Sequence, residues 1–125
     1  MSETRYTEDH EWAALDGDII TIGITDYAQS QLGDIVYVEL PEVGRTLDQG
    51  EETAVVESVK AAGDVTSPVT GEVIEINDVL NDEPELVNQD PENEGWFFKV
   101  KMMEPEQYSD LQDKDSYSKL LDSLS

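Results

Sequence analysis

Lys60 is the side chain whose surroundings in the sequence most favour chemistry. A run typical of a β-strand, residues 53–59, leads into it, and a second such run, residues 64–67, leads away. Between them the lysine is followed only by three small residues that end at Gly63. We therefore predict a β-hairpin whose tip presents one accessible primary amine. An ordinary solvated lysine in a turn is the alternative.

The other candidates for chemistry are weaker. His10-Glu11 lacks the second histidine of a zinc-binding H-E-x-x-H motif, and the chain contains one histidine in total. Residues 90–95 have acids at the spacing of a calcium loop, but Lys101 stands where a bidentate glutamate is needed. Residues 101–103, Lys-Met-Met, are faintly similar to the methionine-flanked lysine of biotin carriers, although no hairpin is predicted around them. Cysteine is absent and no serine, histidine and aspartate set can be assembled, so we expect no catalytic machinery.

The elements that must position Lys60 are predicted to be mostly β-strands. Strand-like runs cover residues 19–24, 35–40, 71–77 and 96–102. Asp16-Gly17-Asp18 predicts a hairpin turn before the first run. Thr25 is a suitable N-cap for a short helix over 26–32, with Gly33 just past its end. After Pro105, apolar residues recur at helical spacing, which predicts one or two short helices packed on the sheet, with a frayed tail as the alternative for the last few residues.

Two segments, beginning at Gly33 and Gly71, share a pattern. Both have glycine, an acid and then a mostly β-branched strand. The repeat suggests an internal duplication in which the copies pack against each other and the lysine hairpin joins them at one end.

Composition and length set the class of protein. We expect one domain over residues 1–125, with a β core over about 6–102 and a C-terminal helical segment over about 105–124. Thirty acidic residues against seven basic ones give a formal net charge of −23, which disfavours binding to nucleic acid or to an anionic membrane. The acids are interleaved with apolar residues, so we favour a folded surface adapted to high salt over a disordered acidic chain. The N-terminus lacks signal or transit features, so we expect a cytoplasmic protein.

An exposed lysine on a rigid hairpin suits the attachment of a covalent arm. Acylation would convert the amine to a neutral amide on a preorganised base. A tethered group reaches several active sites without diffusing away, and the chemistry belongs to the carried cofactor and the partner enzymes.

The segment 57–61, Glu-Ser-Val-Lys-Ala, with Asp64 after it, resembles the lipoylation motif of the glycine cleavage system H-protein family. The resemblance covers nearly the whole chain. Further matching segments follow in the order of the family: Tyr6-Thr7, His10-Glu11-Trp12, 23–28, 32–36, Leu40-Pro41 with Gly44, Pro68 with 71–73, 86–88, Asp90-Pro91 and Gly95-Trp96. Gly63 stands where family members often have serine, and residues 92–94 replace a more usual aromatic-glycine loop. Neither departure removes the attachment site.

The resemblance implies a mainly β fold of the lipoyl/biotinyl type. This is a flattened β-sandwich, or hybrid barrel, with a short helix in the N-terminal half and a C-terminal helix. It also implies lipoate amide-linked to Lys60, as N6-lipoyl-lysine, on a subunit that is not itself an enzyme. In the family the loaded arm can fold into a surface cleft, where Glu11 and Asp64 are candidates to hold its protonated amine.

The resemblance also implies the partners of such a carrier. The arm would accept the aminomethyl group of glycine from the decarboxylating glycine dehydrogenase, a pyridoxal-phosphate enzyme. An aminomethyltransferase would pass the one-carbon unit to tetrahydrofolate, dihydrolipoamide dehydrogenase would reoxidise the dithiol, and a lipoate ligase or lipoyl transferase would attach the arm. A relay of lipoyl groups to other complexes and an unmodified interaction domain stay open as alternatives. An enzyme acting alone is disfavoured.

Overall fold

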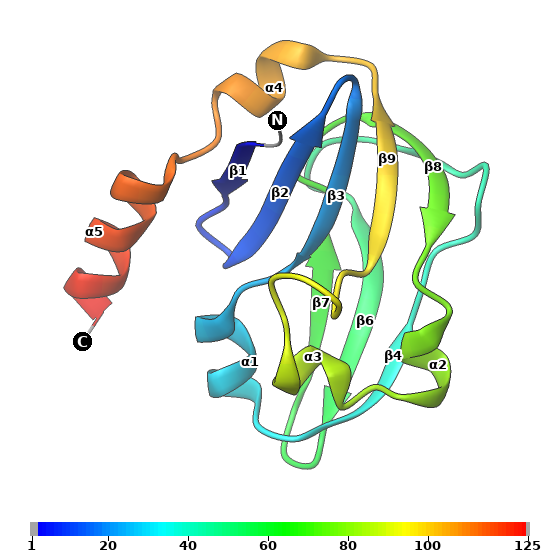
Figure 1. Cartoon of the computed structure of the whole chain (residues 1–125), viewed down its shortest axis with the longest axis vertical. Helices are drawn as coiled ribbons and strands as arrows, with labels where there is room; N and C mark the ends of the chain where they lie inside the picture. Colours follow the sequence, from blue (N-terminus) through cyan, green and yellow to red (C-terminus); the bar gives the residue numbers. More distant parts are fainter. Residues whose placement is uncertain (1–2, 125) are drawn as a thin grey trace.

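The structure, a computed structural model, describes residues 3–124; Met1, Ser2 and Ser125, at the ends of the expected domain, lie outside the described residues. Within this range the chain forms two antiparallel sheets (Figure 1). The larger has the order β1-β2-β3-β9-β8-β5, with β1 Glu3–Tyr6, β2 Glu11–Asp16, β3 Ile19–Ile24, β5 Thr46–Leu47, β8 Gly71–Ile76 and β9 Phe98–Met102. The smaller has the order β4-β6-β7, with β4 Ile35–Glu39, β6 Glu52–Ser58 and β7 Ala62–Thr66. The predicted mainly β sandwich is confirmed.

The helices are short. They are α1 Asp26–Leu32, α2 Val79–Asp82, α3 Leu86–Gln89, α4 Pro105–Ser109 and α5 Lys114–Leu124. The predicted cap of α1 is confirmed, because the Thr25 hydroxyl oxygen accepts from the Ala28 N–H and Gly33 follows the last turn with φ 88°. One or two short helices were expected after Pro105, and the structure has two, α4 and α5. By contrast, α2 and α3 were not predicted, since four residues are too few to show a helical repeat of apolar positions.

The strands predicted at 19–24, 35–40, 71–77 and 96–102 are confirmed as β3, β4, β8 and β9, each within two residues at its ends. The N-terminal strands β1 and β2 are not among the predicted strands. In β2 the alternation of buried and exposed residues that is typical of a strand is hidden, because three consecutive residues, Glu11 to Ala13, are all buried. Trp12 faces a cluster with Tyr6 and Tyr117, while Ala13 belongs to the main core.

The main core lies between the two sheets. It includes Ile22 and Phe98 from the larger sheet and Val38 and Val56 from the smaller one. Helix α5 lies beyond the edge strand β1 in Figure 1 and packs through Tyr117 on the ring of Tyr6. The two elements of the suggested duplication, β4 and β8, lie in different sheets, and Val38 and Val73 from them belong to the same core.

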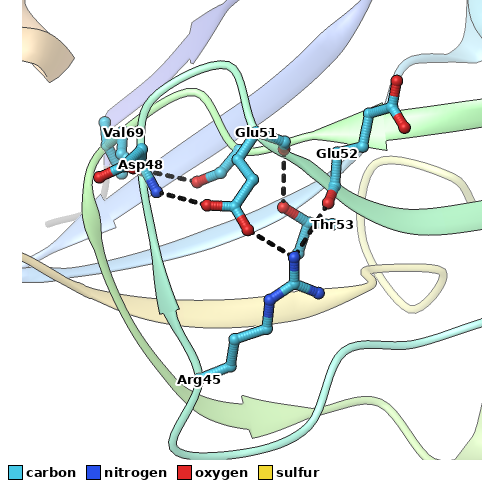
Figure 2. A network of polar contacts seen from close by, with 7 residues as sticks. Arg45, Asp48, Glu51, Glu52, Thr53 and Val69 are labelled. Atoms are coloured by element: carbon cyan, nitrogen blue, oxygen red, sulfur yellow. Dashed lines mark hydrogen bonds and ion pairs between the residues drawn. The ribbon is translucent and has the colours of Figure 1, made fainter.

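The turn that precedes β6 is held by one arginine. Arg45 Nη2 lies 2.5 Å from Glu51 Oε2 and donates to the Glu52 carbonyl at 3.2 Å, while the Asp48 N–H donates to the other carboxylate oxygen of Glu51 (Figure 2). The hydrogen bond from Arg45 lowers the pKa of the Glu51 carboxyl. These contacts anchor the start of β6, at the opposite end of the strand from the hairpin tip.

No helix in the described part of the chain is both long enough and apolar enough to span a membrane.

Candidate functional site

Lys60 lies at the tip of the predicted hairpin, which the structure confirms. Strands β6 and β7 pair up to Glu57 opposite Ala62. The tip is closed by Ser58, whose N–H donates to the Ala61 carbonyl at 2.7 Å and whose hydroxyl oxygen accepts from the N–H groups of Lys60 and Ala61 at 3.2 and 3.0 Å. The Lys60 side chain is exposed. This turn-closing role of Ser58 was not predicted, although a serine side chain that bonds nearby N–H groups is a known turn signal.

The aliphatic stem of Lys60 lies over the loop that follows α1. A Cβ atom added at Gly33 would stand 3.3 Å from Lys60 Cε, and the φ of 88° at this position already favours glycine. The Val59 N–H donates to the Asp34 carbonyl at 3.0 Å, which joins the hairpin tip to the same loop. The lysine is therefore displayed from a base that is fixed on two sides.

This loop is held in turn by Asn88 at the end of α3. Its Oδ1 accepts from the Ile35 N–H at 2.8 Å, and its Nδ2 donates to the Gly33 carbonyl at 2.8 Å and to Gln29 Oε1 at 2.9 Å. In the sequence, Asn88 stands out only as part of the matching segment 86–88. No local signal could show its role, because its partners are more than fifty residues away.

A cleft of about 220 Å³ opens beside the hairpin, and we call it the hairpin cleft. Its walls are the loop between β1 and β2, helix α1 and strands β6 and β7. The lining residues are Asp9, His10, Glu11, Ile24, Tyr27, Ala28, Gln31, Leu32, Val56, Gly63, Asp64 and Val65. The structure thus brings Glu11 and Asp64 to one cleft, while Lys60 lies just outside it on the same hairpin. At Gly63 an added Cβ would make only ordinary van der Waals contacts, with Leu32 and Val56.

Glu11 and Asp64 differ sharply in their surroundings. Glu11 is buried, and its carboxylate accepts from the Thr66 N–H at 2.6 Å, from the Thr66 hydroxyl at 3.0 Å and from the Thr7 hydroxyl at 3.2 Å. Burial raises the pKa of the Glu11 carboxyl to about 7, against the opposing effect of the hydrogen bonds from Thr66. Glu11 therefore also ties β2 to β7 across the two sheets. Asp64 is exposed on β7.

His10, which lacks the second histidine of a zinc motif, has a structural partner in Tyr117. Its Nδ1 lies 2.9 Å from the Tyr117 hydroxyl, and its ring packs against that of Tyr27 with centroids 4.5 Å apart. Burial lowers the pKa of the imidazole, while the nearby Asp9 carboxylate opposes that shift. Among residues 3–124 no cluster of three or more histidine or acidic side chains could hold a metal ion.

Lys101, the candidate for a biotin-like site, lies within β9. It pairs with Ile19 on one side and with Glu72 on the other. It is therefore in the middle of a sheet and not at a hairpin tip.

Comparison with known proteins decides the family. Residues 4–124 match the family model described as glycine cleavage H-protein. The chain belongs to this family. It is 57% identical over 117 residues to the glycine cleavage system H protein of Bradyrhizobium diazoefficiens, covering 94% of this chain and 96% of that one. It is 55% identical over 125 residues to the H protein of Rhodospirillum rubrum, covering 99% of each chain.

The fold agrees with a solved member of the H-protein family. The crystal structure of the glycine cleavage system H protein from Mycobacterium marinum superposes with a TM-score of 0.82, at 35% identity and over 94% of both chains.

Proposed function

We propose that this chain is the lipoyl carrier of the glycine cleavage system, with lipoate amide-linked to Lys60. The observation that carries the proposal is the exposed amine of Lys60 at the tip of a hairpin whose backbone is closed by Ser58 and tied to the loop after α1. Membership of the glycine cleavage H-protein family supports the assignment.

The residues around Lys60 fit such an arm. The small residues Ala61 and Ala62 leave the amine open to an attaching enzyme, which would be a lipoate ligase or a lipoyl transferase. The adjacent hairpin cleft combines apolar side chains such as Leu32 and Val65 with the carboxyls of Glu11 and Asp64, and this lining suits an apolar arm that ends in a protonated amine. Bound lipoate would supply the disulfide and dithiol chemistry. The protein would display the arm on the hairpin tip and shield the carried group in the cleft.

The carrier would serve three enzymes without catalysing a reaction itself. It would take the aminomethyl group of glycine from the decarboxylating glycine dehydrogenase and present it to the aminomethyltransferase. It would then deliver electrons to dihydrolipoamide dehydrogenase. A tether on one exposed residue serves this purpose because it raises the local concentration of the carried group at each active site.

Within the hairpin cleft, Asp64 is the carboxylate more available to the arm. The oxygens of Glu11 already accept hydrogen bonds from Thr66 and Thr7, whereas the side chain of Asp64 is exposed. We propose that Asp64 contacts the amine directly and that Glu11 contributes from the base of the cleft.

Intact-mass spectrometry tests the attachment site. Protein incubated with lipoate, ATP and a lipoate ligase should gain one lipoyl adduct, which Lys60→Arg should lose and Lys101→Arg should keep. An adduct on Lys101 would instead support a biotin-like carrier. Absence of any adduct would support an unmodified interaction domain.

Asp64→Asn tests the arm contact. In loaded protein the variant should release the aminomethyl group, measured as formaldehyde, about two- to fivefold faster, the effect of losing one exposed ion pair. Asp34→Asn is the matched control, because it removes a carboxylate near the hairpin tip that does not line the cleft. Equal release from Asp64→Asn and wild type would exclude the contact.

A further inference from the structure

One hydroxyl group on the C-terminal helix contacts two different walls of the hairpin cleft. Tyr117 Oη lies 2.9 Å from His10 Nδ1 and 2.7 Å from Thr25 Oγ1. Tyr117 does not itself line the cleft, and neither does any other residue of α5 whose side chain the structure describes. Its effect on the cleft must therefore pass through these two residues.

The first wall is the loop between β1 and β2. His10 lies between Asp9 and Glu11, and all three line the hairpin cleft. Its backbone has φ 68°, a left-handed conformation that a residue with a side chain adopts only when its surroundings hold it there. The N–H of His10 donates to the Thr7 carbonyl at 3.1 Å, and the ring is held by the Tyr117 hydroxyl.

The second wall is helix α1. Thr25 caps this helix through its hydroxyl oxygen, which accepts from the Ala28 N–H at 3.3 Å. The following residues Tyr27 and Ala28 line the cleft. The Thr25 N–H also donates to the His10 carbonyl at 2.9 Å, so the two walls meet at the position where the Tyr117 hydroxyl binds.

The tyrosine is fixed by packing on the edge strand β1 of the larger sheet. Its ring is stacked on that of Tyr6, with centroids 4.5 Å apart and an angle of 6° between the planes. Tyr117 is 5% exposed and shares a buried cluster with Tyr6 and Trp12. The position of the hydroxyl therefore depends on the docking of α5.

We propose that Tyr117 is a positioning residue for the hairpin cleft. Its hydroxyl sets the orientation of His10 and of the start of α1. Through this hydroxyl, docked α5 slows the release of the group carried on the arm. The proposal rests on the carrier function proposed above. It gives the C-terminal helix a role in retaining the cargo, although none of its described side chains lines the cleft.

The hydrogen bonds make this role measurable. If Tyr117 donates to His10 Nδ1, the neutral ring carries its hydrogen on Nε2; if His10 Nδ1 donates, Tyr117 donates onward to Thr25. In either arrangement the tyrosine hydroxyl selects one tautomer of the imidazole.

The first experiment uses the protein without lipoate. His10 is the single histidine of the chain, so the ¹⁵N shifts of its ring report the tautomer ratio without assignment ambiguity. Tyr117→Phe keeps the stack on Tyr6 and removes only the hydroxyl. It should move the ratio toward that of an unrestrained imidazole. Tyr6→Phe, the same chemical change in the same cluster, should leave the ratio unchanged. An unaltered ratio in Tyr117→Phe would overturn the proposal.

The second experiment uses lipoylated and loaded protein. Tyr117→Phe should release formaldehyde about two- to fivefold faster than wild type, as expected for the loss of one hydrogen bond, with Tyr6→Phe unchanged. If the adduct forms on Lys60 but Tyr117→Phe releases at the wild-type rate, the positioning role is wrong and the carrier function stands. If no variant accepts lipoate, the carrier function fails, and the tautomer ratio still decides whether Tyr117 orients His10.

Discussion

At the scale of single residues, Glu11 combines a structural and a functional position. Its carboxyl joins β2 to β7 through Thr66 and also forms part of the hairpin cleft. A pKa of about 7 means that the group carries only part of a negative charge near neutral pH. Burial thus makes Glu11 a weaker partner for an ammonium group than the exposed Asp64, unless the ammonium itself lowers the pKa of Glu11.

The raised pKa predicts how Glu11 changes stability with pH. Below pH 4.5 the carboxyl is protonated in the folded and the unfolded chain and has no effect. As the pH rises from 4.5 through 7, the unfolded chain loses this proton more readily, so the folded state is progressively destabilised. A shift from 4.5 to about 7 corresponds to about 3 kcal/mol above pH 7.

Glu11→Gln should remove this pH dependence. The free energy of unfolding is measured by urea titration for the variant and for wild type. The difference, variant minus wild type, should increase by about 3 kcal/mol as the pH is raised from 4.5 to values above 7. Glu8→Gln provides the matched control, because it removes the same charge from an exposed side chain. A constant difference between Glu11→Gln and wild type across this range would contradict the prediction.

At the scale of elements, the hairpin depends on contacts from outside its own sheet. Helix α3 holds the loop of residues 33–35 through Asn88, and this loop binds the hairpin tip through Val59. The lysine is thus positioned by two segments that are distant from it in sequence, the loop of residues 33–35 and α3.

Asn88→Ala should loosen this arrangement. The variant loses three hydrogen bonds and leaves the Ile35 N–H and the Gly33 carbonyl without that partner, so the free energy of unfolding should fall by about 2–4 kcal/mol. Amide exchange at Val59 should become faster, whereas Gln89→Ala, an exposed neighbour, should resemble wild type. Unchanged exchange at Val59 would show that the hairpin tip does not depend on α3.

At the scale of the whole molecule, charge dominates. Seven basic residues cannot neutralise thirty acidic ones, and a net charge of −23 on a chain of this size opposes the compact state. Salt screens the repulsion between exposed charges that are separated by more than a Debye length. We hypothesise that the surface is adapted to high salt.

Thermal melting in dilute buffer and in molar potassium chloride tests this hypothesis. The melting temperature should be higher in the salt. A variant that combines Glu42→Gln, Glu83→Gln and Glu106→Gln, all exposed, should respond less, because fewer charges remain to be screened. Equal melting temperatures for wild type in both solutions would rule the adaptation out.

The features that could be predicted from the sequence are local ones. The strand at 19–24, the helix at 26–32 with its Thr25 cap, and the hairpin that displays Lys60 were all predicted, because β-branched runs, a capping hydroxyl and small turn residues act between neighbours in the chain. The resemblance of the matching segments to one family was also readable without a structure.

The contacts between distant segments became visible only in the tertiary structure. The stacking of two sheets places Glu11 against Thr66 and forms the hairpin cleft beside Asp64. The docking of α5 brings the Tyr117 hydroxyl to Thr25, 92 residues earlier in the chain. Such contacts leave no periodic or capping signal in the sequence, because their energy depends on where whole elements pack and not on what lies next along the chain.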